Sequence, residues 1–138
     1  MKTIEKFDFT DWTFEVFSEK PQFDFQHVHQ VHGAEVVNAI NASTEIKADG
    51  IFQETSSTHA LAIKTADCLP IAIIGEQGVS LLHAGWRGLE QKIIGTPPVK
   101  KIKPISAFIG PAICSHHYEV GPEFAEYFPG LTVQKAEQ

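Results

Sequence analysis

The chain of 138 residues has only two cysteines, Cys68 and Cys114. Two cysteines cannot make the disulfide framework that is typical of small secreted domains. The opening residues, MKTIEKFDFTDW, are charged and have no apolar segment like that of a secretory signal peptide. We therefore expect a cytoplasmic protein with reduced thiols. In that setting a cysteine near histidines is first of all a candidate metal ligand or catalytic group.

Long apolar runs and strong basic clusters are also missing. The longest apolar run, residues 69–75, is far shorter than the roughly 18 residues that a membrane helix needs. The net charge is -6, and we interpret the one basic run, residues 100–103, as a solvated loop. We therefore expect no nucleic-acid partner and no membrane partner. Neither GxGxxG nor GxxxxGK[ST] occurs, so no dinucleotide fold or P-loop is predicted.

The chain does have enough apolar material for a core, since 43% of its residues are hydrophobic and 20% are charged. We expect one domain over residues 1–138. Strands are predicted at residues 12–17, 34–40, 59–65, 69–75, 78–84 and 105–110. Short helices are predicted at residues 89–94 and 123–128, and residues 41–50 are interpreted as a polar connection. Many strands, few helices and short connections indicate an α+β fold with mixed or antiparallel β-sheets.

Two polar residues stand where predicted strands meet loops. Cys68 directly precedes one strand, and His83 lies near the end of the next. Gly75 and Gly78 bracket Glu76-Gln77, which is typical of a hairpin between these two strands. The far ends of a hairpin meet, so its register brings Cys68 and His83 together. Each also has a plain structural interpretation, as a small core residue and a packed histidine.

A third ligand would give two histidines and one cysteine with a fourth position open, as in catalytic zinc sites. The stretch HVHQVHG offers His27, His29 and His32. The residue pattern does not choose among the three. On a strand His27 and His29 share one face and His32 takes the other. A position beside Gly33, where a strand would end, mildly favours His32. A thiolate with imidazoles favours zinc, with copper as the alternative.

Five short motifs then occur in a recognisable order. They are QVHG (residues 30–33), TADCLP (65–70), HAGWRG (83–88), IGPAI (109–113) and YEVG (118–121). Together these motifs, which span about residues 26–128, resemble the YfiH-like family, labelled laccase-domain or polyphenol oxidase proteins. The resemblance implies an α+β fold with mixed β-sheets flanked by helices, as a reduced α/β/β/α sandwich. It also implies a zinc-dependent purine nucleoside phosphorylase with adenosine deaminase activity. It also implies that His32, Cys68 and His83 hold the metal, and that purine nucleoside and phosphate are the partners.

The chain departs from the family pattern in three respects. Family members are nearly twice as long, and their flanking elements with Asn-Arg and Tyr-Arg-Arg are absent here. The segment after HAGWRG is shortened. Ala112 stands where the family has a cysteine in GPCI. A minimal enzyme, a metal- or nucleoside-binding domain without turnover, and a fragment all remain open.

Four further residues complete the predicted site. Arg87 is the candidate phosphate clamp, because its planar guanidinium suits phosphate and it sits at a glycine-flanked helix start that offers backbone N–H groups. Asp67, beside Cys68, is a candidate to orient a ligand or accept a proton. Trp86 is a candidate to stack on the purine, and Gln30 a weaker substrate-binding candidate. The catalytic set predicted is therefore Cys68, Asp67 and Arg87.

Other activities are weighed against this one. A multicopper oxidase needs several copper centres and more HxH pairs than the single HVH, although a copper-dependent polyphenol oxidase side activity stays an alternative. A cysteine hydrolase would use Cys68 as nucleophile and His83 as base. A homodimer that covers exposed sheet edges is a further expectation.

Overall fold

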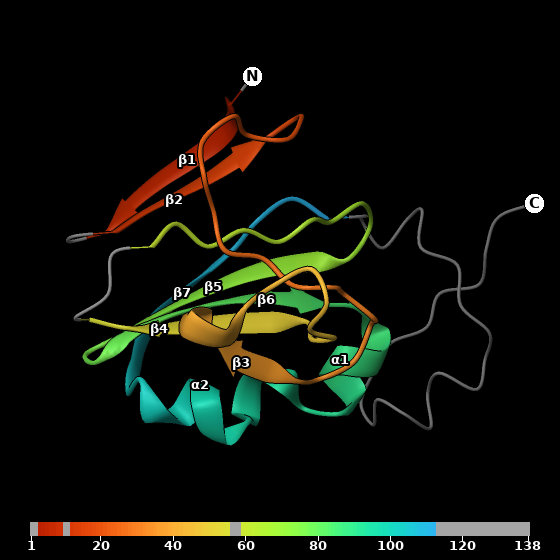
Figure 1. Cartoon of the computed structure of the whole chain (residues 1–138). Helices are drawn as coiled ribbons and strands as arrows, with labels where there is room; N and C mark the ends of the chain where they lie inside the picture. The colour runs from red at the N-terminus through yellow and green to blue at the C-terminus, as the bar shows by residue number, and fades with distance from the viewer. Residues whose placement is uncertain (1–2, 10–11, 56–58, 113–138) are drawn as a thin grey trace, which may run out of the picture.

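The computed structural model describes residues 3–9, 12–55 and 59–112, and its centre is a five-stranded mixed sheet (Figure 1). The sheet contains β3 (Val36–Asn38), β4 (Gly50–Glu54), β5 (Leu69–Gly75), β6 (Gly78–Ala84) and β7 (Pro104–Ile109). Its strand order is β3-β4-β6-β5-β7. β3 runs parallel to β4, and every other neighbouring pair is antiparallel. The central strands β5 and β6 are almost wholly buried, which agrees with their continuous apolar sequences.

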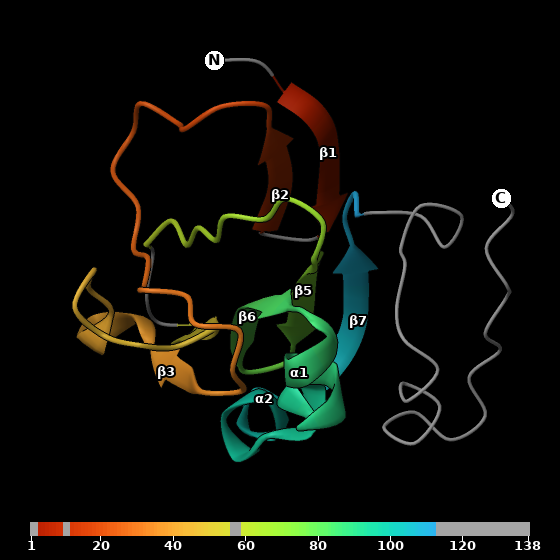
Figure 2. The ribbon, with the colours of Figure 1, turned by 90° about the vertical axis from the view of Figure 1, so that its right-hand side faces the viewer.

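Short helices cover one face of this sheet, as Figures 1 and 2 show. They are α1 (Trp86–Glu90), the 3-10 turn η2 (Ile93–Gly95) and α2 (Pro97–Lys101). The core beneath them consists of Val36, Phe52, Ile71, Ile73, Leu82, Ala84, Ile93, Val99 and Ile102. A second, smaller cluster around Ile51 includes Val28 and Ala48, with Leu61 packed against it. The sheet is thus buried on both faces around β4.

A two-stranded antiparallel sheet lies apart from the larger one, above it in Figure 1. It pairs β1 (Thr3–Phe9) with β2 (Trp12–Phe17). Phe7 and Phe14 attach it to β7, because their rings lie 5.0 Å and 4.8 Å from that of Phe108. Between this hairpin and the larger sheet run the segments that carry residues 21–33 and 59–68 (Figures 1 and 2). No helix in the described part of the chain is long and apolar enough to cross a membrane.

Much of the predicted architecture is confirmed. The α+β class and the mixed sheet are present, and the strands 12–17, 69–75 and 78–84 have the predicted bounds. The strand predicted at 105–110 is shifted by one residue, to 104–109. The strand predicted at 34–40 is reduced to 36–38 and continues as the 3-10 turn η1 (Ala39–Asn41), where Asn38 caps the Ile40 amide.

Other predictions were wrong. Residues 59–65 form no strand, and their one bridge joins Leu61 to Gln26. The helix predicted at 89–94 begins instead at Trp86 and ends at Glu90, because Lys92 adopts a left-handed backbone with φ 61°. Lys100 and Lys101 are exposed but end α2 rather than lie in a loop. The strands β1 and β4 were not predicted. The helix predicted at 123–128 lies outside the described residues.

Candidate metal centre

The β5–β6 hairpin brings Cys68 and His83 together, as its predicted register requires. Leu69 pairs with Ala84 and Pro70 pairs with His83. Cys68 directly precedes β5 and is half-buried, and His83 lies near the end of β6 and is only 4% exposed. Both side chains therefore stand at the same end of the two central strands.

Of the three histidines in HVHQVHG, His32 reaches these two side chains. The donor atoms of His32, Cys68 and His83 all lie within 4.8 Å of one another. The rings of His32 and His83 meet edge to face, with centroids 5.1 Å apart. His27 instead packs edge to face on Phe25, with centroids 5.0 Å apart. His29 is exposed and bridges to Lys47 through its backbone. Within the described residues, this trio is the one group of at least three His, Cys, Asp or Glu placed to hold a metal ion.

The chemistry and spacing of the three donors fit a zinc or copper ion. Tetrahedral zinc with nitrogen and sulfur ligands needs donor atoms about 3.3–3.8 Å apart, given bond lengths near 2.0–2.3 Å. The observed spacing of up to 4.8 Å exceeds this value by about 1 Å, so binding would draw the three side chains closer together. Three protein ligands leave a fourth position for water or substrate, which is typical of catalytic rather than structural zinc sites.

A fourth residue, Asp49, contacts both histidines of the trio, and it was not predicted from the sequence. Its carboxylate is fully buried, and one oxygen, Oδ2, lies 2.7 Å from His83 Nδ1. The same oxygen accepts a hydrogen bond from the His32 backbone N–H at 3.0 Å. Oδ1 accepts from the backbone N–H groups of Val31 at 3.0 Å and Gly33 at 2.8 Å. The only sequence signal was an acidic residue directly before an apolar run, and Asp-Gly is equally typical of an exposed turn.

Two glycines of HAGWRG let the ligand segments approach one another. A Cβ on Gly85 would lie 3.2 Å from Cys68 Sγ and 3.5 Å from His32 Cδ2. A Cβ on Gly88 would lie 2.9 Å from the carbonyl oxygen of Gly33. The segment that follows His83 therefore packs directly against the segment that carries His32. Both positions need glycine because the neighbouring groups are close, and neither has a left-handed backbone.

The surroundings of Cys68 disfavour its negative charge in the metal-free protein. Partial burial raises the pKa of the Cys68 thiol, and the nearby carboxylates of Asp67 and Asp49 raise it further. The free thiol is thus protonated near neutral pH. A bound cation would reverse this preference, because a metal-coordinated cysteine is a thiolate.

Known proteins resemble this chain over most of its length. A family model described as multi-copper polyphenol oxidoreductase laccase matches residues 13–137. The chain belongs to this family. It is 34% identical over 105 residues to a purine nucleoside phosphorylase of Aquifex aeolicus, covering 72% of this chain and 50% of that protein. It is 36% identical over 107 residues to the purine nucleoside phosphorylase YfiH of Escherichia coli, covering 73% of this chain and 44% of that one. The resemblance to YfiH-like proteins is confirmed.

Solved structures of similar proteins share the fold. NMB0706 of Neisseria meningitidis is 31% identical with a TM-score of 0.64, over 75% of this chain and 45% of that one. YlmD from Geobacillus stearothermophilus is 28% identical with a TM-score of 0.62, over the same shares of the two chains. The chain spans about half the length of the curated relatives it matches.

The remaining predicted site residues of this YfiH-like chain differ in their exposure and in their contacts. Arg87 is exposed, and its guanidinium lies 5.0 Å from the centre of the Trp86 ring. Asp67 is exposed beside Cys68. The Gln30 amide makes two hydrogen bonds to the backbone of Lys64, at 2.6 Å and 2.7 Å. Their roles in substrate binding and catalysis remain predictions.

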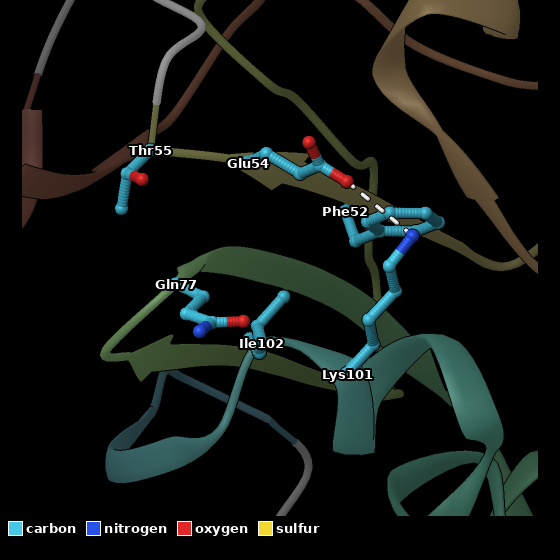
Figure 3. A pocket seen from close by; sticks show the side chains of 6 residues that line it. All are labelled: Phe52, Glu54, Thr55, Gln77, Lys101 and Ile102. Carbon is cyan, nitrogen blue, oxygen red and sulfur yellow. Dashed lines mark ion pairs between the residues drawn. The ribbon is translucent and has the colours of Figure 1, made fainter.

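A separate hollow lies at the opposite end of the sheet, where β4 ends and β6 begins (Figure 3). It has a volume of about 330 Å³, and its lining residues are Phe52, Glu54, Thr55, Gln77, Lys101 and Ile102. Its two charged groups face each other, with Lys101 Nζ 3.4 Å from Glu54 Oε1. Five residues of β6, 78–82, separate Gln77 in the hollow from His83, a span of roughly 20 Å. The hollow is therefore distinct from the metal centre.

Proposed function

We propose that this chain carries a zinc-dependent purine nucleoside phosphorylase site, with His32, Cys68 and His83 as the metal ligands. The observation that supports it is the convergence of these three donors on one point, with a buried carboxylate behind them. Relatives that share about a third of the sequence bear the phosphorylase name. When bound, the zinc ion would supply a Lewis acid that polarises oxygen atoms and activates water near neutral pH.

The residues next to the ligands would bind the two substrates. Arg87 would clamp phosphate through its planar fork of donors. Trp86 would stack on the purine, since it directly follows Gly85, whose backbone packs against Cys68 Sγ. In phosphorolysis a phosphate oxygen bonds to the ribose C1′ while the C1′–N9 bond breaks. The electron pair leaves with the purine, which takes up a proton. Asp67 would orient the substrate or carry that proton.

Adenosine deamination is the second reaction expected of the same site. Water would add at C6 of the purine and ammonia would leave, giving inosine. Both reactions place a purine nucleoside at the fourth position of the trio, so the same residues would serve both. The presence or absence of phosphate separates the two, since only phosphorolysis consumes it.

Product analysis tests the proposal. Adenosine is incubated with zinc-loaded protein, with and without phosphate, and the products are separated by chromatography. Phosphate-dependent release of adenine that is lost in Cys68→Ala, and kept in the distant control Lys101→Ala, would support the phosphorylase. Inosine formed without phosphate would indicate the deaminase. Unchanged adenosine from protein shown to hold zinc would refute both activities and leave a metal- or nucleoside-binding domain.

Copper loading addresses the polyphenol oxidase alternative. A site of two nitrogens and one sulfur suits copper as well as zinc. The described residues supply one such trio, whereas a multicopper oxidase needs several centres. Oxidation of a phenol by the copper-loaded protein, absent from the zinc-loaded protein, would establish this side activity.

One observation favours the cysteine hydrolase alternative. In space Cys68 lies near His83, and His83 contacts Asp49, which is the arrangement of nucleophile, base and carboxylate. The raised pKa of Cys68 speaks against it, because the nucleophile must be a thiolate. Alkylation of metal-free protein, in a Cys114→Ser background, separates the two. A hydrolase activity present without metal and abolished by alkylation would overturn the zinc assignment.

A further inference from the structure

The buried carboxylate of Asp49 touches two of the three ligand residues in different ways. It meets the ring of His83 through Oδ2 at 2.7 Å. It meets His32 through the backbone, since the N–H groups of residues 31–33 all donate to its two oxygens at 2.8–3.0 Å. Each oxygen accepts two hydrogen bonds, so the carboxylate has no free acceptor position and is fully compensated despite being inaccessible to solvent.

The contact to His83 decides which ring nitrogen is available to a metal. An ionised carboxylate only accepts hydrogen bonds, so Nδ1 of His83 must carry the proton. The lone pair then lies on Nε2, the nitrogen on the far side of the ring from Asp49. In the other neutral tautomer Nε2 would carry the proton and be unable to bind a metal. In metal-binding histidines, a carboxylate that accepts a hydrogen bond from the ring nitrogen not bound to the metal also fixes the orientation of the ring.

The contact to His32 holds its backbone in a conformation that residues other than glycine rarely adopt. His32 is left-handed, with φ 61°. Three successive N–H groups that converge on one anion make a concave nest, which holds such a conformation in place. The Asp49 backbone adds a further link, because its carbonyl oxygen accepts from the His83 N–H at 2.7 Å. One residue therefore sets the ring of one ligand and the backbone of the other.

We propose that Asp49 is a positioning residue that couples His32 and His83, so that the metal centre is formed before the metal arrives. The inference rests on the metal site of the proposed function and is independent of the nucleoside chemistry. Its prediction is that loss of the Asp49 charge weakens the centre while the fold persists. A merely structural role would instead change stability and leave the metal affinity of the folded protein untouched.

Asp49→Asn is the informative substitution, because it keeps the shape of the side chain. The amide has one acceptor oxygen, and its NH2 group would face N–H donors. We expect the zinc dissociation constant, measured by competition with a chromogenic chelator, to rise about 10- to 100-fold. With cobalt(II), the thiolate charge-transfer band of Cys68 should remain while the ligand-field bands change. Glu35→Gln is the matched control, since it removes one exposed carboxylate near the same segment.

Two experiments decide the proposal. Weaker zinc binding and altered cobalt bands in folded Asp49→Asn, with Glu35→Gln like wild type, support it. Equal zinc affinity in Asp49→Asn and wild type refutes it. Nitrogen NMR of the histidine rings in metal-free wild-type protein gives an independent answer even where the variant does not fold. A proton on Nδ1 of His83 supports the proposal, and a proton on Nε2 overturns it. Wild-type protein that binds zinc but converts no adenosine would refute only the phosphorylase.

Discussion

At the scale of single residues, the protonated thiol of Cys68 predicts that zinc binding at the proposed site depends on pH. The pKa of this thiol is raised, so at neutral pH zinc must displace its proton. Below that pKa the zinc affinity should rise about tenfold per pH unit, and above it the affinity should level off. Because the pKa is raised, the rise should continue to higher pH than for an ordinary cysteine. Titration calorimetry in buffers of different ionisation enthalpy should count about one proton released per zinc ion near pH 7.5.

Cys68→Ser is the control for this measurement, in a Cys114→Ser background that removes the other thiol. The hydroxyl of serine keeps its proton, so the variant should bind zinc weakly and with a much smaller pH dependence. Zinc binding by the wild-type protein without proton release at neutral pH would show that Cys68 is not a ligand, or that its thiol is already ionised.

The glycines of HAGWRG give a second residue-scale prediction. Gly88→Ala puts a Cβ 2.9 Å from the Gly33 carbonyl oxygen, so the backbone beside His32 must move. We expect a loss of about 1–3 kcal/mol in the free energy of unfolding, together with weaker zinc binding. Gly95→Ala is the matched control, because nothing lies within 4 Å of its added Cβ. Denaturant unfolding and zinc titration of both variants check this. Equal behaviour of the two variants would contradict the close packing.

At the scale of elements, the segment 59–68 reaches the candidate metal centre with a single β-bridge, between Leu61 and Gln26. Two glutamine side chains take the place of a neighbouring strand. The amide of Gln53, which is buried, bonds the N–H and C=O of His59 at 2.8 Å and 2.9 Å. The amide of Gln30 does the same for Lys64. Because Gln30 is two residues from His32 and Lys64 is four from Cys68, this contact joins two ligand segments.

Gln30→Ala should therefore loosen the approach to Cys68. We expect faster amide hydrogen exchange at Lys64, whose N–H loses its acceptor, and a loss of about 0.5–1.5 kcal/mol in stability. Zinc affinity should fall modestly. If Gln30 instead binds substrate, the variant would raise KM for the nucleoside and leave exchange at Lys64 unchanged. Hydrogen exchange followed by NMR, beside nucleoside kinetics, separates these two roles.

Features of the fold that depend on local interactions could be predicted from the sequence, whereas features that depend on contacts between distant residues could not. The hairpin 69–75 and 78–84 was predicted to the residue, because its pairing and turn are local, and the approach of Cys68 to His83 followed from it. Residues 59–65 have the alternation of a strand, but their backbone bonds the side chains of Gln53 and Gln30 and the backbone of Gln26. Asp49 was missed for a similar reason. Its partners lie 16–34 residues away in sequence, and only the folded chain brings them together.

At the scale of the whole molecule, the candidate metal centre brings the β5–β6 hairpin together with a segment that lies far from it in the sequence. His32 lies in the segment before β3, Cys68 precedes β5, and His83 lies near the end of β6. A metal ion held by all three would cross-link the irregular segments 21–33 and 59–68 to the central sheet (Figure 2). An ion that binds the folded chain and not the unfolded one stabilises the fold by mass action.

Removal of the metal should therefore lower the thermal stability of the entire described core, beyond the centre itself. Free zinc at 100 times its dissociation constant stabilises by about 2.7 kcal/mol, which corresponds to a rise in Tm on the order of 10 °C for a chain of this size. We expect a chelator to reverse this rise in wild-type protein. Cys68→Ala should show almost no rise, since it has lost one of three ligands, and Lys101→Ala should behave like wild type. Calorimetry at several zinc concentrations is the measurement. A Tm that does not depend on zinc would mean that the three ligand residues are not joined by a metal, and the phosphorylase proposal would fall with that result.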